Sequence, residues 1–125
     1  MRRLLVLAAL VAAFVFLVPV IARAHEWYSG THDPVTGGGC CGGHDCAALE
    51  LEPGMLTGEA EGYRLRLTLE QARRINPQRF EPLDVLIPWG RIQPSPDGNF
   101  HLCIPARRAS WMPQDLYCFF APPNT

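Results

Sequence analysis

Cysteine content constrains the fold of this chain more than any other feature of its sequence. The 125 residues include five cysteines, and in a small exported protein such cysteines are expected to form disulfides. An odd number leaves one thiol over, which is either free or joins two copies of the chain in a disulfide-linked dimer. The five are Cys40, Cys41, Cys46, Cys103 and Cys118.

The sequence leaves the pairing of these cysteines open, although it disfavours one arrangement. Cys40 and Cys41 are adjacent, and a bond between neighbours is strained because bridged Cα atoms normally lie ~5.5 Å apart. We expect two disulfides, one of which ties the segment 40–46 to a C-terminal cysteine. Such a bond closes a long loop and restricts the unfolded chain, which is worth ~3–4 kcal/mol in the chain-entropy model.

Residues 1–24 have the three-part layout of a secretory signal peptide. Arginines precede an apolar run at 4–21, and Ala22 and Ala24 supply the small side chains that a signal peptidase reads. The run is also at the short limit for a membrane span, so the alternative is an uncleaved inner-membrane anchor. Pro19 favours cleavage, because it interrupts the helix just before the cut. Either way, we expect the rest of the chain in the periplasm or secreted.

Residues 25–125 form one small mature domain with two parts. Residues 25–46 are rich in glycine and cysteine and poor in aliphatic residues, so we expect a loop that cannot pack a core by itself. Residues 47–125 carry the folded core. All 12 acidic residues follow the cut, which makes the mature chain acidic and argues against nucleic acid as a partner. Membrane contact is expected only through the N-terminal segment, if it is not cleaved.

The core has the patterns of a small, disulfide-stabilised α+β fold, mainly antiparallel β with one short helix. Residues 62–67 alternate apolar and charged side chains, which is typical of a half-buried strand. Further strands are expected at 47–51, 84–92, 99–104 and 116–121. Pro88 interrupts one of these strands, and we expect a bulge or an edge position there.

A short helix is expected to begin after Thr68. Thr68 and Gln71 match the capping box, in which each side chain accepts a hydrogen bond from the backbone N–H of the other residue. Glu70 suits the positive end of the helix dipole, and the two arginines at 73–74 suit its negative end. The Asn-Pro pair at 76–77 is expected to end the helix.

Four short motifs stand near the two ends of the mature chain. They are His25-Glu26-Trp27-Tyr28, then Cys40-Cys41 with His44-Asp45-Cys46, then Pro94-Ser95-Pro96-Asp97-Gly98 with His101 and Cys103, and finally Cys118-Phe119-Phe120-Ala121-Pro122-Pro123. Together they resemble a family of short uncharacterised exported bacterial proteins. That family has a His-x-Trp-Tyr mature N-terminus and Cys-Cys…Asp-Cys, Ser-Pro-Asp-Gly…His-x-Cys and Cys-Phe-Phe-x-Pro motifs. The resemblance implies export and paired cysteines, and it implies no activity.

Histidines provide the sharpest functional hypothesis. Cleavage after Ala24 would make His25 the N-terminus, where its α-amine and one ring nitrogen can bind a single Cu(II) ion. Candidate further ligands are His32, His44 and His101. This arrangement resembles the N-terminal site of small periplasmic copper carriers. The alternative is a solvated His25 that binds nothing, because the spacing of the histidines matches no ligand motif.

Other chemistries fit the sequence less well. A zinc site would have suitable ligand types at Cys40, Cys41, Cys46 and His44 but unsuitable spacing, and oxidised cysteines cannot supply thiolates. Thiol redox chemistry lacks a Cys-x-x-Cys motif, and no serine lies in a nucleophile elbow. Alternation along a strand places His101 on the same face as Cys103, where it can be a structural, hydrogen-bonded histidine.

Because none of these chemistries fits the sequence well, the leading function that we expect is a structural or interaction module of the cell envelope, with an unknown partner. We expect no catalytic residue and no firmly implied cofactor, and copper binding through His25 is the alternative function. Aromatic side chains are expected to be core residues and not a ligand platform. The ones concerned are Trp89, Trp111, Phe119 and Phe120.

Overall fold

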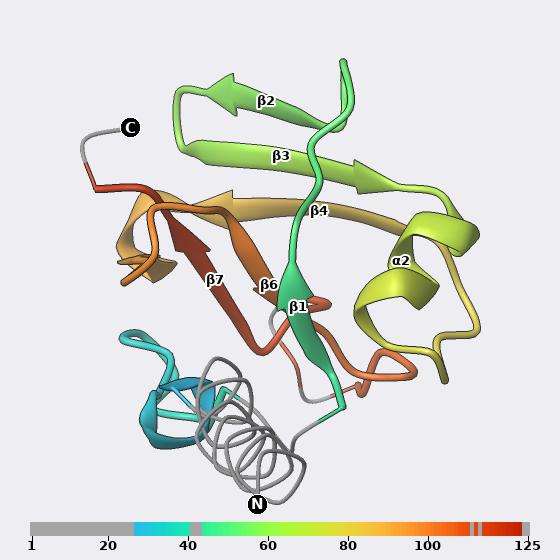
Figure 1. Ribbon diagram of the computed structural model, residues 1–125, viewed down its shortest axis with the longest axis horizontal. Coiled ribbons are helices and arrows are strands. Elements are labelled where there is room, and N and C mark those ends of the chain that lie inside the picture. The colour runs from blue at the N-terminus through green and yellow to red at the C-terminus, as the bar shows by residue number, and fades with distance from the viewer. Residues whose placement is uncertain (1–26, 41–43, 111, 113, 124–125) are drawn as a thin grey trace, which may run out of the picture.

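Seven strands form two small sheets in the computed structural model, which describes residues 27–40, 44–110, 112 and 114–123. One sheet has the order β2-β3-β4 and the other the order β1-β6-β7-β5, and all pairs are antiparallel except β5 with β7. The strands are β1 (Cys46–Ala48), β2 (Leu56–Glu59), β3 (Gly62–Leu67), β4 (Leu83–Pro88), β5 (Ile92–Pro94), β6 (His101–Cys103) and β7 (Cys118–Ala121). Together with one α-helix, they confirm the expected α+β fold (Figure 1).

The helix α2 (Leu69–Ile75) begins where the capping box predicts. Thr68 Oγ1 accepts a hydrogen bond from Gln71 N at 3.2 Å, and Gln71 Oε1 accepts one from Thr68 N at 2.9 Å. Asn76 ends the helix, and its buried side-chain amide donates to the carbonyl oxygen of Ile104 at 2.9 Å. The helix is therefore anchored at both ends, and its far end is tied to the chain just after β6.

The stretch 84–92 is not the single strand that the sequence predicts. β4 ends at Pro88, a 3₁₀ turn η2 (Trp89–Arg91) follows, and β5 then continues in the other sheet. Because proline has no N–H to give to a strand ladder, Pro88 is a natural point for the chain to leave its sheet. The expectation that Trp89 belongs to the core is also wrong, since 49% of this residue is exposed.

The four-stranded sheet is buried on both of its faces. Along β7, Phe119 and Ala121 face the main core, whereas Cys118 and Phe120 face the opposite side, as strand alternation requires. The core role expected for Phe119 and Phe120 is thus confirmed, and Trp111 lies outside the described residues. The main core fills the space between the two sheets and α2 with these side chains: Leu65, Leu67, Ala72, Ile75, Leu83, Val85, Ile87, Leu102, Ile104 and Leu116.

The N-terminal segment 27–40 covers the outer face of this sheet (Figure 1). It contains more regular structure than the loop expected for residues 25–46. A 3₁₀ turn η1 (Trp27–Gly30) opens it, and His32 and Gly39 form an isolated antiparallel bridge. The strands begin with β1 at Cys46, while Tyr28 and Cys40 of the N-terminal segment are already buried.

Two disulfides are present, of which Cys40–Cys118 fastens the N-terminal segment to β7 and Cys46–Cys103 fastens β1 to β6. They confirm the expected pair of bonds and the link from the segment 40–46 to a C-terminal cysteine, while Cys41 lies outside the described residues. Disulfides indicate an oxidising, extracytoplasmic environment. In the part of the chain that the structure describes, no helix has the length and apolarity to cross a membrane.

At Gly62, the backbone of β3 lies so close to the backbone of β4 that there is no room for a side chain. A Cβ atom on Gly62 would lie 2.7 Å from the carbonyl carbon of Ile87 and 2.9 Å from Cα of Pro88, and closer still to the Ile87 oxygen. Because a strand backbone cannot move aside as a flexible side chain can, we expect Gly62→Ala to lower the free energy of unfolding by about 2–3 kcal/mol. Denaturant titration of the oxidised protein measures this change.

Gly58→Ala is the matched control in the same hairpin. A Cβ atom on Gly58 would meet nothing within 4 Å, so the free energy of unfolding should change by less than about 1 kcal/mol. Equal losses of stability in the two variants would contradict the close approach at Gly62.

Candidate functional site

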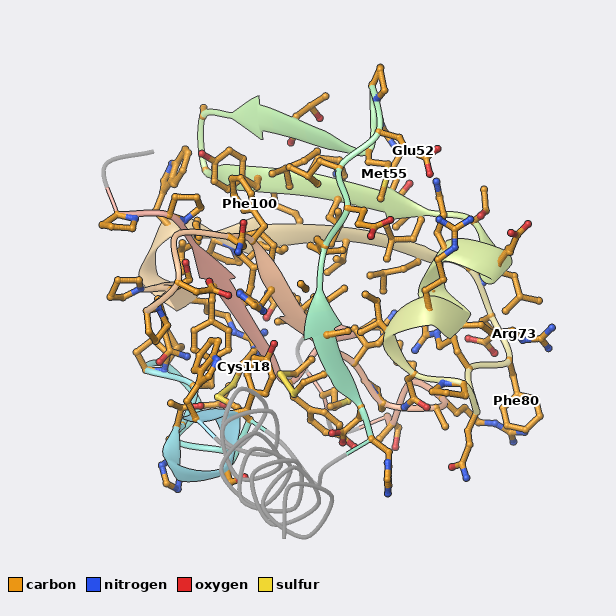
Figure 2. All side chains as sticks on the ribbon, in the orientation of Figure 1. Glu52, Met55, Arg73, Phe80, Phe100 and Cys118 are labelled. Carbon is orange, nitrogen blue, oxygen red and sulfur yellow. A yellow bond between two sulfur atoms is a disulfide. The ribbon has the colours of Figure 1, made fainter. Side chains whose placement is uncertain are left out.

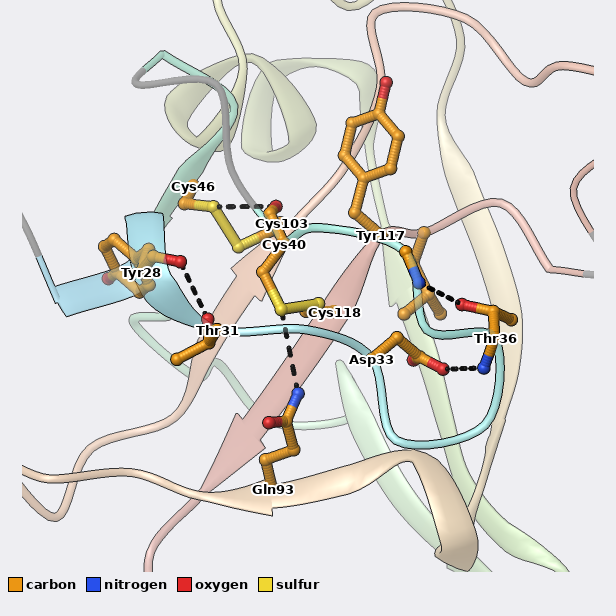
Figure 3. Close-up of a disulfide and its surroundings, with 12 residues drawn as sticks. Tyr28, Thr31, Asp33, Thr36, Cys40, Cys46, Gln93, Cys103, Tyr117 and Cys118 are labelled. Carbon is orange, nitrogen blue, oxygen red and sulfur yellow. Dashed lines mark hydrogen bonds between the residues drawn. A yellow bond between two sulfur atoms is a disulfide. The ribbon is translucent and has the colours of Figure 1, made fainter.

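Residues from each of the four sequence motifs meet on the outer face of the four-stranded sheet. They form a buried group that we call the sulfur–aromatic cluster, in which the two disulfides lie next to one another (Figure 3). Its members are Tyr28, Cys40, Cys103, Cys118 and Phe120, with Trp27, Cys46 and Tyr117 packed against them. Because the motifs are far apart in the sequence, only the fold brings them together.

His101 is the centre of three hydrogen-bonded side chains beside this cluster, Tyr28, His101 and the exposed Asp97, which we call the tether. Its Nδ1 is bonded to the hydroxyl of Tyr28, and its Nε2 lies 2.7 Å from Asp97 Oδ1. Trp27 packs edge-on against the imidazole, with ring centroids 5.0 Å apart. Tyr28 and His101 are almost fully buried. His101 and Cys103 share one strand face, as alternation predicts, and His101 is a hydrogen-bonded structural residue.

The electrostatics of this tether determine where its protons lie. Burial, followed by the charge of Asp97, raises the pKa of the Tyr28 hydroxyl to about 12, so the hydroxyl keeps its proton at neutral pH. Burial alone would raise the pKa of Asp97, but the backbone N–H of Asn99 and the His101 ring lower it to about 2. The ionised carboxylate therefore accepts a hydrogen bond from Nε2–H, and the imidazole joins η1 to the turn before β6.

The candidate metal ligands lie apart in the described structure. His101 uses both ring nitrogens within the protein, His32 is exposed on the N-terminal segment, and His44 is exposed before β1. His25 lies outside the described residues. Among the residues that are described, no group of three or more His, Cys, Asp or Glu side chains is placed to hold a metal ion. Copper binding at His25 stays a prediction, and His101 could join such a site only by releasing Tyr28 or Asp97.

A buried ion pair joins the N-terminal segment to the core, and no sequence pattern points to it. Arg91 Nε lies 2.6 Å from Asp33 Oδ2, and the two side chains are 3% and 0% exposed. The same guanidinium donates to Gln114 Oε1 at 2.6 Å and to the carbonyl oxygens of Leu116 and Tyr117. One side chain of η2 thus connects the N-terminal segment with the segment that precedes β7.

Asp33 also shapes the turn that follows it. Its Oδ1 accepts hydrogen bonds from the backbone N–H groups of Thr36 at 2.7 Å and Val35 at 3.0 Å, and Gly37 closes the turn with a φ of 69°. Burial alone would raise the pKa of the Asp33 carboxyl, but the N–H of Thr36 and then Arg91 lower it below its usual value. The carboxylate is therefore ionised, and it holds both Arg91 and the turn.

Two exposed apolar side chains, Val35 in this turn and Trp89 in η2, belong to segments that approach each other at Gly90, and we call them the Val35–Trp89 patch. Val35 is 65% exposed, and its Cγ2 lies 3.7 Å from the position that a Cβ atom would take on Gly90. Trp89 is fixed in orientation, because its Nε1 donates to the carbonyl oxygen of Ala60 at 2.9 Å and its ring packs on Tyr63 with centroids 5.0 Å apart.

A mainly apolar cavity of about 440 Å³ separates the N-terminal turn from residues 112–117. Its volume falls in the range of ligand pockets, ~300–1,000 Å³. The lining residues are Thr36, Gly38, Gly39, Arg91, Met112, Leu116 and Tyr117. Thr36 directly follows Val35, and Arg91 shares η2 with Trp89, so the cavity and the patch are built on the same two elements.

Tyr28→Phe tests the contribution of the tether to stability. The variant keeps the ring but leaves the buried Nδ1 of His101 without its hydrogen-bond partner, so we expect the free energy of unfolding to fall by about 1–3 kcal/mol at neutral pH. Tyr117→Phe is the control, because its ring packs on the same cluster while its hydroxyl has no hydrogen-bond partner among the described residues. If both variants lose the same stability in denaturant titrations, the bond to His101 contributes nothing of its own.

Asp97 is expected to contribute to the loss of stability in acid. Because its pKa is lowered from 3.8 to about 2 in the folded protein, its ionised form stabilises the fold above the unfolded pKa, and this contribution disappears as the pH falls towards about 2. Asp33, whose pKa is also lowered, adds to the same decline. We expect Asp97→Asn to give a shallower decline, because an amide oxygen still accepts from His101 but does not titrate.

Urea titrations between about pH 2 and about pH 7 measure this dependence. Asp84→Asn provides the control, since the Asp84 side chain is 58% exposed and pairs only with arginines of β3 at the surface. An Asp97→Asn protein with the same acid dependence as the wild type would show that Asp97 is not responsible.

Comparison with known proteins identifies no relative of this chain. No protein-family model matches it, and neither does a curated protein or a solved structure. The structural features that bear on its function are the tether, the Asp33–Arg91 ion pair and the Val35–Trp89 patch.

Proposed function

We propose that this protein is an exported interaction module that binds another protein of the cell envelope through the Val35–Trp89 patch. The observation that carries the proposal is the state of Trp89, which is half exposed while its indole is held by Ala60 and Tyr63. Tryptophan is enriched among the residues that dominate binding energy at interfaces. A side chain that is already fixed loses little conformational freedom on binding, so more of its contact energy appears as affinity.

Export to the periplasm or the exterior is part of this proposal. Residues 1–24 carry the signal-peptide pattern, with cleavage expected after Ala24. The two disulfides support the same compartment, because such bonds persist in oxidising environments. In an alternative form of the proposal, the uncleaved segment anchors the module to the inner membrane and the patch still faces the periplasm.

The buried polar groups support a binding role in preference to catalysis. Tyr28, His101 and Asp97 are hydrogen-bonded to one another, and Asp33 and Arg91 satisfy each other in the same way. These groups stabilise the surface, and their protons and charges are already used within the fold. The Asp33–Arg91 pair holds the turn that carries Val35, and the tether holds η1 at the start of the same segment.

Site-specific photocrosslinking tests the proposed function. With a photoreactive amino acid in place of Val35, we expect the exported protein to crosslink to a partner in living cells. Trp89→Ala in the same chain should lower the yield at least about tenfold, because truncation of an anchoring tryptophan typically costs more than ~1.4 kcal/mol of binding energy. A crosslink that does not depend on Trp89, or no crosslink at all, would show that the patch does not bind.

Phe80 provides the matched control for this experiment. It is 60% exposed and lies near α2, across the molecule from Cys118 (Figure 2). Phe80→Ala should leave the crosslink from position 35 unchanged. A loss as large as that caused by Trp89→Ala would indicate general surface stickiness.

A further inference from the structure

An isolated antiparallel bridge with an open outer edge borders the cavity beside the Val35–Trp89 patch. His32 and Gly39 form an antiparallel bridge, and hydrogen bonds of 2.8 and 3.0 Å join the residues on either side of them. This pattern makes His32 and Gly39 a non-hydrogen-bonded pair, in which the N–H and C=O of each residue point away from the other. Gly39 therefore turns one donor and one acceptor outward from the bridge.

The backbone groups of Gly39 are not used within the described part of the protein. Its N–H and C=O form no hydrogen bond with any described residue, and the residue is exposed. An edge with unpaired backbone groups is a template for an added strand. In recognition by strand addition, main-chain hydrogen bonds supply affinity, and pockets for alternate side chains supply specificity.

The cavity provides such a pocket next to the open edge. Gly38 and Gly39 form part of one wall, and Met112, Leu116 and Tyr117 form part of the other. Because alternate side chains of a strand point to the same side, a strand added at Gly39 can direct one side chain towards this cavity. The volume of about 440 Å³ accommodates a large side chain.

Charge at the cavity favours an uncharged side chain. Arg91 is the charged lining residue, and its guanidinium is already bonded to Asp33, Gln114 and the carbonyl oxygens of residues 116 and 117. A carboxylate would have to compete with Asp33 for the guanidinium, while a cation would be repelled by it. Burying either charge without a partner costs several kcal/mol.

Both walls of the cavity are held in place without a partner. The wall that contains Gly39 is fixed by the neighbouring Cys40–Cys118 bond and by the Asp33–Arg91 pair. The opposite segment is bonded through Gln114 to Arg91, and through Asp115 to the buried guanidinium of Arg79. A preformed site lowers the entropic cost of binding.

We propose that the edge at Gly39 binds an extended segment of the partner polypeptide by strand addition, with one large apolar side chain of that segment in the cavity. The inference rests on the proposed interaction function and specifies the form in which the partner binds. Trp89 and Val35 then contact the partner next to the added strand.

Variants of Gly39 test the backbone pairing in the crosslinking experiment from position 35. Gly39→Pro removes the outward N–H, whereas Gly39→Ala keeps it, and a Cβ atom at this position would meet nothing within 4 Å. We expect the proline variant to lose at least about tenfold in crosslink yield and the alanine variant to stay within about twofold of the wild type. If the crosslink depends on Trp89 but not on the N–H of Gly39, the interaction function stands and strand addition is wrong.

Peptide binding gives a second test that does not depend on a proline variant. The probe is a capped six-residue peptide of alternating threonine and phenylalanine, titrated into the oxidised, nitrogen-15-labelled protein. We expect saturable binding with a large shift of the Gly39 amide signal, and at least about tenfold weaker binding when the peptide amides are N-methylated. A version with glutamate in place of phenylalanine should also bind at least about tenfold more weakly.

The peptide experiment tests the Gly39 edge and its cavity separately from the Val35–Trp89 patch. No binding by the phenylalanine peptide up to about 5 mM, or equal binding by its N-methylated form, would overturn the proposal. Saturable binding at Gly39 together with no crosslink from position 35 would instead overturn the interaction function of the patch. The Gly39 edge and its cavity would then remain as a peptide-binding site.

Discussion

The buried guanidinium of Arg91 joins the parts of this molecule that its sheets do not connect. It bonds to Asp33 in the N-terminal segment, to Gln114, and to the carbonyl oxygens of Leu116 and Tyr117 just before β7. Removing one partner of a buried ion pair costs about 3–5 kcal/mol, because the remaining charge is left without compensation. Neither segment can therefore leave the core without that cost, and the cavity between them depends on the same side chain.

The disulfides and the buried polar contacts make different contributions to this arrangement. The two bonds span 78 and 57 residues, and a first bond over such a loop contributes about 4 kcal/mol in the chain-entropy model. The second contributes less, since the first already holds the two regions together. A disulfide limits distance, whereas hydrogen bonds also fix direction. The Asp33–Arg91 pair and the Tyr28–His101 bond therefore orient a segment that the disulfides keep nearby, which suits a small domain with a limited core.

Sequence patterns predicted the features that depend on neighbouring residues. The strand at 62–67 and the capping box at Thr68 are local, and both are confirmed. The long-range contacts were not predictable in this way. Tyr28 lies 73 positions from its partner His101, and the two members of the Asp33–Arg91 pair are 58 positions apart. Nothing local distinguishes a buried arginine from the exposed arginines that are far more common, so the residue on which the candidate site depends could not be recognised from the sequence.

The exposure of Trp89 follows from the burial of Arg91. Both belong to η2, a three-residue 3₁₀ turn whose successive side chains point in different directions. With Arg91 turned inward to Asp33, Trp89 is left at the surface, and the other oxygen of Asp33 holds the turn that places Val35 beside Gly90. The ionised pair thus fixes the turn that carries Val35, while Ala60 and Tyr63 orient the indole of Trp89. The proposed interaction surface therefore consists of two exposed apolar side chains on segments that are fixed by buried polar contacts and by the hydrogen bond of Trp89.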